Sequence, residues 1–297
     1  MRTRNVLPVA VAAAAALTLT ACTSASEGGS ASASTDPTAV TKDDAIAALV
    51  PEAVAADGKL TIGSDLTYAP AEFVDTDGKT PVGFDIEIAT ALAHLMGLEP
   101  DIQSSTFDAI IPGVGTRYEA GISSFTVTPA RLEAVSMVTY LEAGSLFAVA
   151  KGNPDGVDPD SLCGLTVGVQ TGTTQQDELE ETKATCPSDA PLTLLPYEKQ
   201  ADVTTNLVGG KVQAMYADSP VTSYAVEQTE GQLEVLGDIR DAAPEAVVVP
   251  RGDDAMAKAV QAALQKLMDD GTLQQILASW GNGESALTTA EIDPKVG

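Results

Sequence analysis

Leu165-Thr166-Val167-Gly168-Val169-Gln170-Thr171-Gly172-Thr173-Thr174 is the stretch of this 297-residue chain that indicates its fold. The residues from Thr166 to Val169 are mostly apolar and β-branched, which predicts a short buried strand. Gly172-Thr173-Thr174 then predicts a turn that opens a helix. A strand that leads directly into a helix is the building unit of α/β proteins.

The same alternation recurs on both sides of this stretch. Strands are predicted over 60–64, 120–123, 166–169, 213–217 and 246–250, and helices over 85–96, 107–114, 199–208 and 253–278 with a break at Gly271. The alternation predicts an α/β fold with mostly parallel sheets flanked by helices. From Gly58 onward about 240 residues remain, which is enough for two lobes with separate cores.

Charge and composition exclude several classes of function. The chain has 42 acidic and 16 basic residues and a formal net charge of −26, so we expect no binding to nucleic acid. His94 is the only histidine and lies in an apolar helical run, where we expect a packed or half-exposed residue and not a ligand or catalytic base. We therefore expect no Ser/His/Asp catalytic set, no metal site and no cofactor.

The N-terminus predicts export. Arg2 and Arg4 precede an apolar run over 6–19 that is too short to span a bilayer, so residues 1–21 are interpreted as a signal peptide. Leu19-Thr20-Ala21-Cys22 resembles the lipobox of bacterial lipoproteins, which implies a lipidated (palmitate-bearing) Cys22 at the extracytoplasmic face of the cell membrane. An ordinary signal peptide with a chance cysteine is the alternative. Residues 22–40 are rich in Ser, Ala and Gly and predict a flexible tether.

Two further cysteines, Cys163 and Cys186, remain in the exported part of the chain. Disulfides persist in oxidising compartments, so we expect the two to be bonded to each other. Two buried thiols are the alternative.

Ser123-Ser124-Phe125-Thr126-Val127-Thr128-Pro129-Ala130-Arg131 is suited to bind a small carboxylate. An arginine fork pairs with a carboxylate through two parallel hydrogen bonds, and serine and threonine add neutral donors. Pro129 suits the first turn of a helix. A capped helix start with a solvated arginine is the alternative for this stretch alone.

Taken together, the motifs of this chain resemble those of the periplasmic amino-acid-binding proteins of ABC transporters (solute-binding protein family 3). The matching segments occur in order at 63–73, 82–89, 107–112, 123–131, 165–174, 217–220, 270–273 and 276–281. Glu119 and Gly121 depart from the usual pattern of that family, beside the expected site.

The resemblance implies a two-lobed clamp of the type II periplasmic-binding-protein kind. Lobe 1 would comprise 58–146 and 246–283, lobe 2 would comprise 147–245, and 284–297 would be a C-terminal tail. Two hinge strands would cross near 147–150 and 246–249, with the ligand between the lobes.

The resemblance also implies roles for nine residues. Arg131, Thr126 and Thr174 would hold the α-carboxylate of an amino acid, the last at a helix start where free amides favour an anion. Asp218 and Ser124 would hold the α-ammonium. Tyr68 and Phe107 would enclose the side chain, although Phe107 could equally be a core residue, and Asp65 and Gln175 would read its end.

The implied function is that of a monomeric substrate-binding lipoprotein of an ABC importer. It would capture a polar or basic L-amino acid and deliver it to the permease subunits in the membrane. Asp65 favours a cation or an amide donor, so glutamine-like or basic ligands rank above acidic ones. The alternative is a clamp-fold dehydratase of the prephenate or arogenate type, with Asp65 or Glu142 as general acid. The ectodomain of a receptor is a third class, which we disfavour because no signalling domain follows.

Overall fold

The computed structural model describes residues 39–296, which all belong to one compact unit. No helix within this range is long and apolar enough to cross a membrane. The predicted signal peptide and Cys22 lie outside the described residues.

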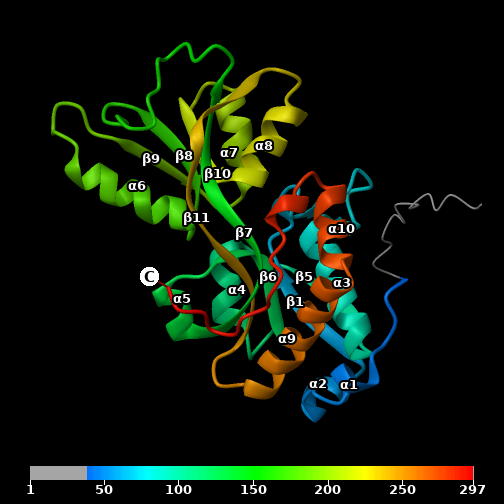
Figure 1. Ribbon diagram of the computed structural model, residues 1–297. Coiled ribbons are helices and arrows are strands. Elements are labelled where there is room, and N and C mark those ends of the chain that lie inside the picture. The colour runs from blue at the N-terminus through cyan, green and yellow to red at the C-terminus, as the bar shows by residue number, and fades with distance from the viewer. Residues whose placement is uncertain (1–38, 297) are drawn as a thin grey trace, which may run out of the picture. The chain divides into compact units, whose positions relative to one another are not determined.

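An eight-stranded sheet with the order β5-β1-β6-β11-β7-β10-β8-β9 runs through the unit (Figure 1). The strands outside the central pair are β1 (Lys59–Ser64), β5 (Glu99–Ser104), β6 (Ala120–Thr126), β8 (Thr166–Gln170), β9 (Thr193–Tyr197) and β10 (Ala214–Asp218). β1 pairs in parallel with β5 and β6, and β8 pairs in parallel with β9 and β10. The sheet therefore consists of two parallel blocks, one for each lobe of the predicted clamp.

Two long antiparallel strands, β7 (Val135–Ala150) and β11 (Leu233–Pro250), join the blocks. The predicted hinge segment 147–150 lies between β10 and the start of β11. The other predicted segment, 246–249, lies between β7 and β6. The register of β11 against β7 shifts between Leu236 and Ala243, where β11 bulges, and again between Glu245 and Ala246. Gly144 of β7 lies against this bulge, because a Cβ there would sit 2.4 Å from the carbonyl oxygen of Arg240.

Helices cover each block of the sheet (Figure 1). The first lobe carries α1 (Asp44–Ala47), α2 (Glu52–Ala55), α3 (Phe84–Met96), α4 (Phe107–Gly113), α5 (Pro129–Ala134), α9 (Asp254–Asp269), α10 (Thr272–Ser279) and the 3-10 turn η2 (Gly283–Ser285). The second lobe carries α6 (Thr174–Thr185), α7 (Gln200–Val208) and α8 (Ser219–Gln228). A small sheet of β2 (Thr67–Tyr68), β3 (Glu72–Val74) and β4 (Pro81–Val82) precedes α3.

Each lobe has a core of its own. In the first lobe the apolar faces of α3 and α9 are buried, with Leu92 and Leu264 almost fully inaccessible. In the second lobe Phe147 of β7 stacks on Tyr216 of β10 with ring centroids 3.9 Å apart, and Val167 packs in the same cluster. Two cores joined by crossing strands give the α/β clamp that the sequence predicted.

The predicted disulfide is present in the structure. Cys163, before β8, is bonded to Cys186, at the end of α6, with a Cα–Cα distance of 5.5 Å. The bridge therefore fixes α6 to the second lobe.

The predicted C-terminal tail packs along the first-lobe half of β7. The backbone N–H of Thr139 donates to the carbonyl of Glu291, and the N–H of Leu287 donates to the carbonyl of Tyr140. Ala290 is buried between α9 and β7, and Arg251 pairs with Asp293. This segment thus adds to the first lobe.

Three aromatic residues meet on the outside of the lobe junction. Phe73 of β3 lies 6.1 Å from the ring of Tyr224 of α8, and Trp280 at the end of α10 meets Phe73 edge-on at 5.8 Å. The indole N–H of Trp280 donates to Glu87 of α3 at 3.0 Å. The contact between Phe73 and Tyr224 joins the two lobes.

Candidate functional site

Arg131 lies where the sequence placed it, in the first turn of a capped helix. Thr128 is the N-cap of α5, and its hydroxyl accepts from the backbone N–H of Arg131. The guanidinium donates to the carbonyl of Thr126 at 2.8 Å and to the carbonyl of Gly172, in the second lobe, at 3.2 Å. Burial lowers the pKa of Arg131, and Asp218 is the carboxylate that opposes this most. Arg131 is therefore a half-buried residue at the start of a capped helix, and its two hydrogen bonds join the lobes.

Two stacked rings lie beneath the guanidinium. Phe107, the first residue of α4, stacks on Phe125 of β6 with centroids 4.9 Å apart, and Arg131 lies 5.3 Å from the Phe107 centroid. Gly172, from the second lobe, lies close to Phe107 and Asp108. Its φ is +82°, and a Cβ added to it would lie only 3.0 Å from the Cβ of Asp108. A glycine is needed at this close approach. Phe107 thus serves both as a core residue and as the support for Arg131.

Asp218, at the end of β10, is the centre of a second set of contacts between the lobes. It is 7 % exposed, and it accepts from the hydroxyl of Tyr68 at 2.7 Å and from the amide nitrogen of Gln175 at 2.7 Å. Gln175 also donates to Ser145 of β7. Burial raises the pKa of Asp218, and the bonds from Tyr68 and Gln175 oppose that shift. Tyr68 comes from the first lobe, so this set also ties the lobes together.

Asp65 follows β1 and forms a third contact between the lobes. Its carboxylate accepts from Thr67 at 2.9 Å and from the amide nitrogen of Gln170, the last residue of β8, at 2.5 Å. Burial raises the pKa of Asp65 to about 6, although these hydrogen bonds and the nearby charge of Lys199 act to lower it. The side-chain oxygen of Gln170 is buried without a hydrogen-bond partner. The Asp65 carboxylate and the Gln170 side-chain oxygen are therefore two neighbouring hydrogen-bond acceptors.

Ser124 has an unusual backbone conformation that buried groups hold in place. Its φ is +47°, in the left-handed region. The backbone N–H of Ser124 donates to Asp85, the second residue of α3, at 2.9 Å, and the hydroxyl of Tyr140 donates to the other oxygen of Asp85 at 2.6 Å. The hydroxyl of the adjacent Ser123 donates to the buried Glu72. Backbone strain that the surroundings fix in this way is common at binding sites.

Six of the nine predicted residues contact one another in two groups of three, whereas Asp65, Ser124 and Thr174 contact other residues. The groups are Tyr68, Gln175 and Asp218, and Phe107, Thr126 and Arg131. Thr126 provides its carbonyl to Arg131, and Thr174 is the first residue of α6, two positions after Gly172. Gln175 lies beside Asp218, while the amide beside Asp65 belongs to Gln170. Gln170 was missed in the sequence, although a polar residue at the carboxyl end of a parallel strand is a signal for a binding site.

Glu245 was missed as well. It is 2 % exposed and lies on β11 opposite Thr126. An acidic residue directly before a continuous apolar strand could have drawn attention to it. The junction of the lobes therefore holds more buried carboxylates than the two, Asp65 and Asp218, that the sequence analysis named.

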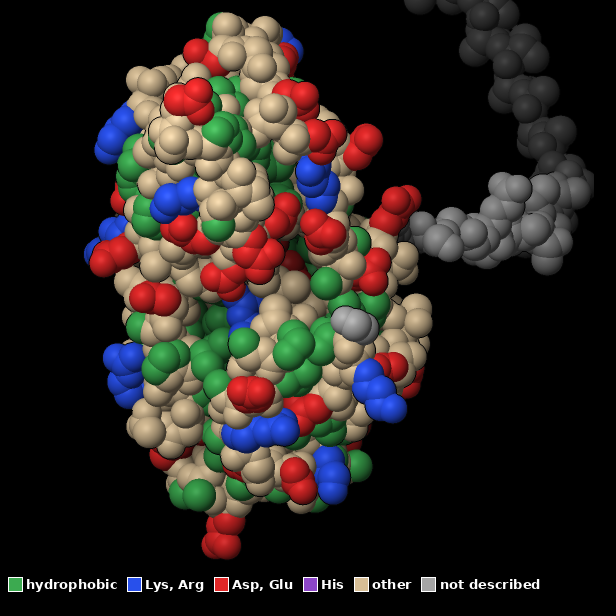
Figure 2. All heavy atoms as spheres, turned by 90° about the vertical axis from the view of Figure 1, so that its left-hand side faces the viewer, with side chains coloured by type: hydrophobic (Ala, Val, Ile, Leu, Met, Phe, Trp, Pro, Cys, Tyr) green, Lys and Arg blue, Asp and Glu red, His purple; other side chains and the backbone are tan. Residues whose placement is uncertain are grey.

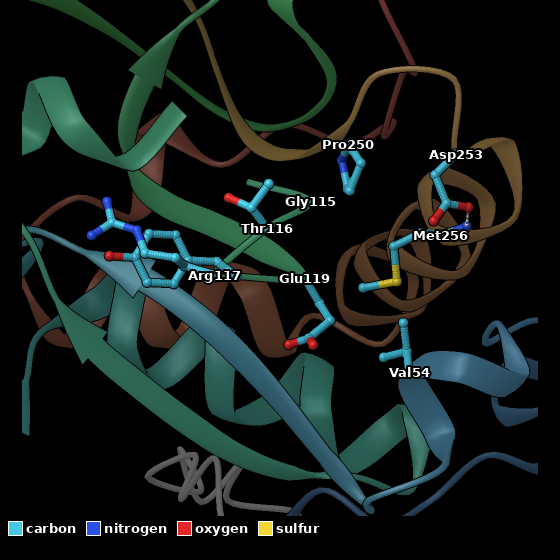
Figure 3. Close-up of a pocket in the computed structure, with 9 residues that line it drawn as sticks. Val54, Gly115, Thr116, Arg117, Glu119, Pro250, Asp253 and Met256 are labelled. Atoms are coloured by element: carbon cyan, nitrogen blue, oxygen red, sulfur yellow. Dashed lines mark hydrogen bonds between the residues drawn. The ribbon is translucent and has the colours of Figure 1, made fainter. Parts of the chain in front are cut away.

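A separate pocket of about 210 Å³ lies between α9 and the loop before β6 (Figure 3). Arg117 and Glu119 line it, and none of the nine predicted residues does. Glu119 accepts from the backbone N–H of Thr61 at 2.7 Å, so it is a structural residue and does not lie beside the predicted ligand set. Gly121 leaves no room for a side chain, because a Cβ would lie 2.7 Å from Ile110.

One face of the surface is markedly acidic. In Figure 2 acidic side chains gather across its middle, at the level of a hollow in which a basic side chain is visible. Across residues 39–296, no group of three or more potential ligand side chains could hold a metal ion. The arrangement is suited to bind a small charged molecule by complementary charge.

Residues 60–283 match the sequence profile of the bacterial extracellular solute-binding proteins, family 3. The chain belongs to this family. Among its curated relatives is the arginine-binding protein ArgT of Corynebacterium glutamicum, 39% identical over 253 residues, which cover 84% of this chain and 82% of ArgT. The L-cystine-binding protein TcyJ of Escherichia coli strain K12 is 27% identical, over 75% of this chain and 82% of TcyJ.

Solved structures agree with this family assignment. An ancestral arginine-binding protein bound to arginine superposes with a TM-score of 0.70 at 28% identity, covering 75% of this chain and 98% of that one. The family is described as solute-binding proteins and these relatives are named as binding proteins, which favours a binding role over the dehydratase alternative.

Proposed function

We propose that this protein is the substrate-binding component of an ABC importer that captures a basic L-amino acid, with L-arginine the first candidate. The observation that carries the proposal is that the carboxylate of Asp65 accepts from the amide nitrogen of Gln170, while the oxygen of the same amide is buried without a partner. A ligand guanidinium has five N–H donors, and it would pair with both acceptors. A carboxylate on the ligand side chain would be repelled by the charge of Asp65.

The other groups suit the two charges that every amino acid carries. Arg131 uses two of its five donors on the carbonyls of Thr126 and Gly172, so a ligand carboxylate can accept from the rest. Thr174 opens α6, whose free amides favour the same anion. Asp218 and Ser124 would accept hydrogen bonds from the ammonium. Tyr68, whose hydroxyl donates to Asp218, would cover the ligand.

Closure of the clamp follows from this division of contacts. The groups for the carboxylate and for the ammonium come from both lobes, so the full set exists only when the lobes meet. We propose lobe boundaries at 58–146 with 246–283, and at 147–245, with 284–297 packed on the first lobe. ArgT and the ancestral protein bound to arginine, through their names, support arginine in particular.

We also propose that the protein is a monomer held at the outer face of the membrane through a lipidated Cys22, from which it passes its ligand to the permease. The support is the sequence Leu19-Thr20-Ala21-Cys22 after the apolar run. Two or more acyl chains would make that attachment stable.

A thermal-shift screen tests the choice of ligand. The common L-amino acids, L-ornithine, L-cystine and D-arginine would be added separately to the purified protein. A ligand that binds only the folded state raises the melting temperature, and we expect the largest rise with L-arginine and none with D-arginine. A larger rise with L-glutamate than with L-arginine would refute the assignment of a basic ligand.

A further inference from the structure

Glu245 is a buried carboxylate at the point where the two lobes are joined. It is 2 % exposed and lies on β11, paired with Thr126 of β6 on one side and with Leu141 of β7 on the other. Residues directly opposite in an antiparallel pair project to the same face of the sheet. The Glu245 side chain therefore lies on the same face as that of Thr126, whose carbonyl binds Arg131.

The charges around Glu245 come from both lobes. Burial raises its pKa well above the usual range, and the carboxylates of Asp218 and Asp85 raise it further. A hydrogen bond with the Ser124 side chain and the charge of Arg131 act in the opposite direction. The charge of Glu245 also helps to raise the pKa values of two hydroxyls in the cleft, those of Tyr68 and Tyr140.

Asp218 alone is poorly placed to hold a buried ammonium. One of its oxygens accepts from Tyr68 and the other from Gln175, both at 2.7 Å. An ammonium brings three N–H donors into the cleft, and a buried charge is costly unless it is both paired and hydrogen-bonded. Glu245, with Ser124 beside it, supplies the acceptors that Asp218 lacks.

We propose that Glu245 is a direct partner of the ligand's α-ammonium, which it shares with Asp218 across the cleft. This inference rests on the proposed function, because it assumes that an amino acid binds between the lobes. Asp218 comes from the second lobe and Glu245 from the strand that joins the lobes. Closure of the lobes around an ammonium therefore places both carboxylates beside the same positive charge.

Proton release is a direct consequence. Burial beside Asp218 and Asp85 disfavours the charged form of Glu245 and raises its pKa, whereas an ammonium placed against the carboxylate favours that form. A proton held by the carboxyl group then passes to the buffer, and no other bond changes. L-arginine should therefore release more protons on binding than a ligand that lacks the ammonium.

The test is calorimetry of the full chain with L-arginine and with 5-guanidinopentanoic acid, which lacks only the α-ammonium. We expect Glu245→Gln to weaken L-arginine binding roughly ten- to a hundredfold, as for loss of a hydrogen bond to a charged group. Binding of the analogue should change little. Glu142→Gln is the matched control, because Glu142 lies near Glu245 on the neighbouring strand β7 but is exposed.

Titrations in buffers of different ionisation enthalpy count the protons released. We expect the wild-type protein to release more protons with L-arginine than with the analogue, and this comparison does not depend on whether Glu245→Gln folds. Equal release with both probes, or L-arginine binding unchanged in a folded Glu245→Gln variant, would overturn the role of Glu245. A wild-type protein that does not bind L-arginine would instead contradict the proposed function.

Discussion

Replacing Arg131 with alanine tests the centre of the proposed site. In the structure Arg131 lies over the rings of Phe107 and Phe125 and donates to carbonyls of both lobes, at 2.8 Å to Thr126 and at 3.2 Å to Gly172. The change removes the charge that would pair with the ligand carboxylate and one tie between the lobes. It leaves the cores intact, because the side chain is only half-buried and lies at the cleft.

The size of the effect follows from the loss of one half of a desolvated charge pair. Such a truncation costs on the order of 2–5 kcal/mol, which corresponds to a dissociation constant roughly thirty- to several-thousand-fold higher. We expect the lower part of this range, since the side chain is only half-buried and solvent screens part of its charge. Arg131→Lys should recover only part of the loss, because a point charge cannot form the two parallel hydrogen bonds of the fork.

The assay is isothermal titration calorimetry with L-arginine on variants whose melting curves show a folded protein. Arg117→Ala is the matched control. Arg117 also lies over an aromatic ring, 5.2 Å from the centroid of Tyr118, and donates to the carbonyl of Ala109, but it lines the separate pocket of Figure 3. An Arg131→Ala variant that binds as tightly as Arg117→Ala would refute the assignment of the carboxylate site.

Three further predictions test other parts of the molecule. Replacing both Cys163 and Cys186 with serine should lower the free energy of unfolding by about 3 kcal/mol, given their sequence separation of 23, and an unchanged urea midpoint would contradict this. Binding of L-arginine should weaken as the pH falls through about 6, because burial raises the pKa of Asp65 to about 6 and the protonated carboxyl loses its charge. Calorimetry at several pH values should show that Asp65→Asn removes the part of this dependence centred near pH 6. Cys22→Ser should abolish incorporation of a labelled fatty acid in a bacterial host, and label retained at the wild-type level would rule out the lipid attachment.

Local features of this fold were predictable because short-range chemistry determines them. The strand and helix start from Thr166 to Thr174 and the capped helix that begins at Pro129 both appear where the sequence indicated. In each case the signal lies within a few residues, in β-branched runs, capping hydroxyls or a proline in the first turn.

The contacts between distant segments were not predictable in the same way. Tyr68 and Asp218 are 150 residues apart, and Gln170 reaches Asp65 over 105 residues. The burial of Glu245 depends on the register of β11 against two other strands, and its neighbours in the sequence give no sign of that register. The full length of β7 and the packing of the C-terminal segment along it also arise from pairing between strands and not from local propensity.

The aromatic contact on the outside of the lobe junction has a practical consequence. Trp280 is the only tryptophan of the chain, and its ring meets Phe73, which in turn contacts Tyr224 of the other lobe. Opening of the lobes would separate Phe73 from Tyr224 and alter the surroundings of the indole. The protein therefore carries a built-in optical reporter, whose emission can be followed in a stopped-flow instrument to time the movement of the lobes without an attached dye.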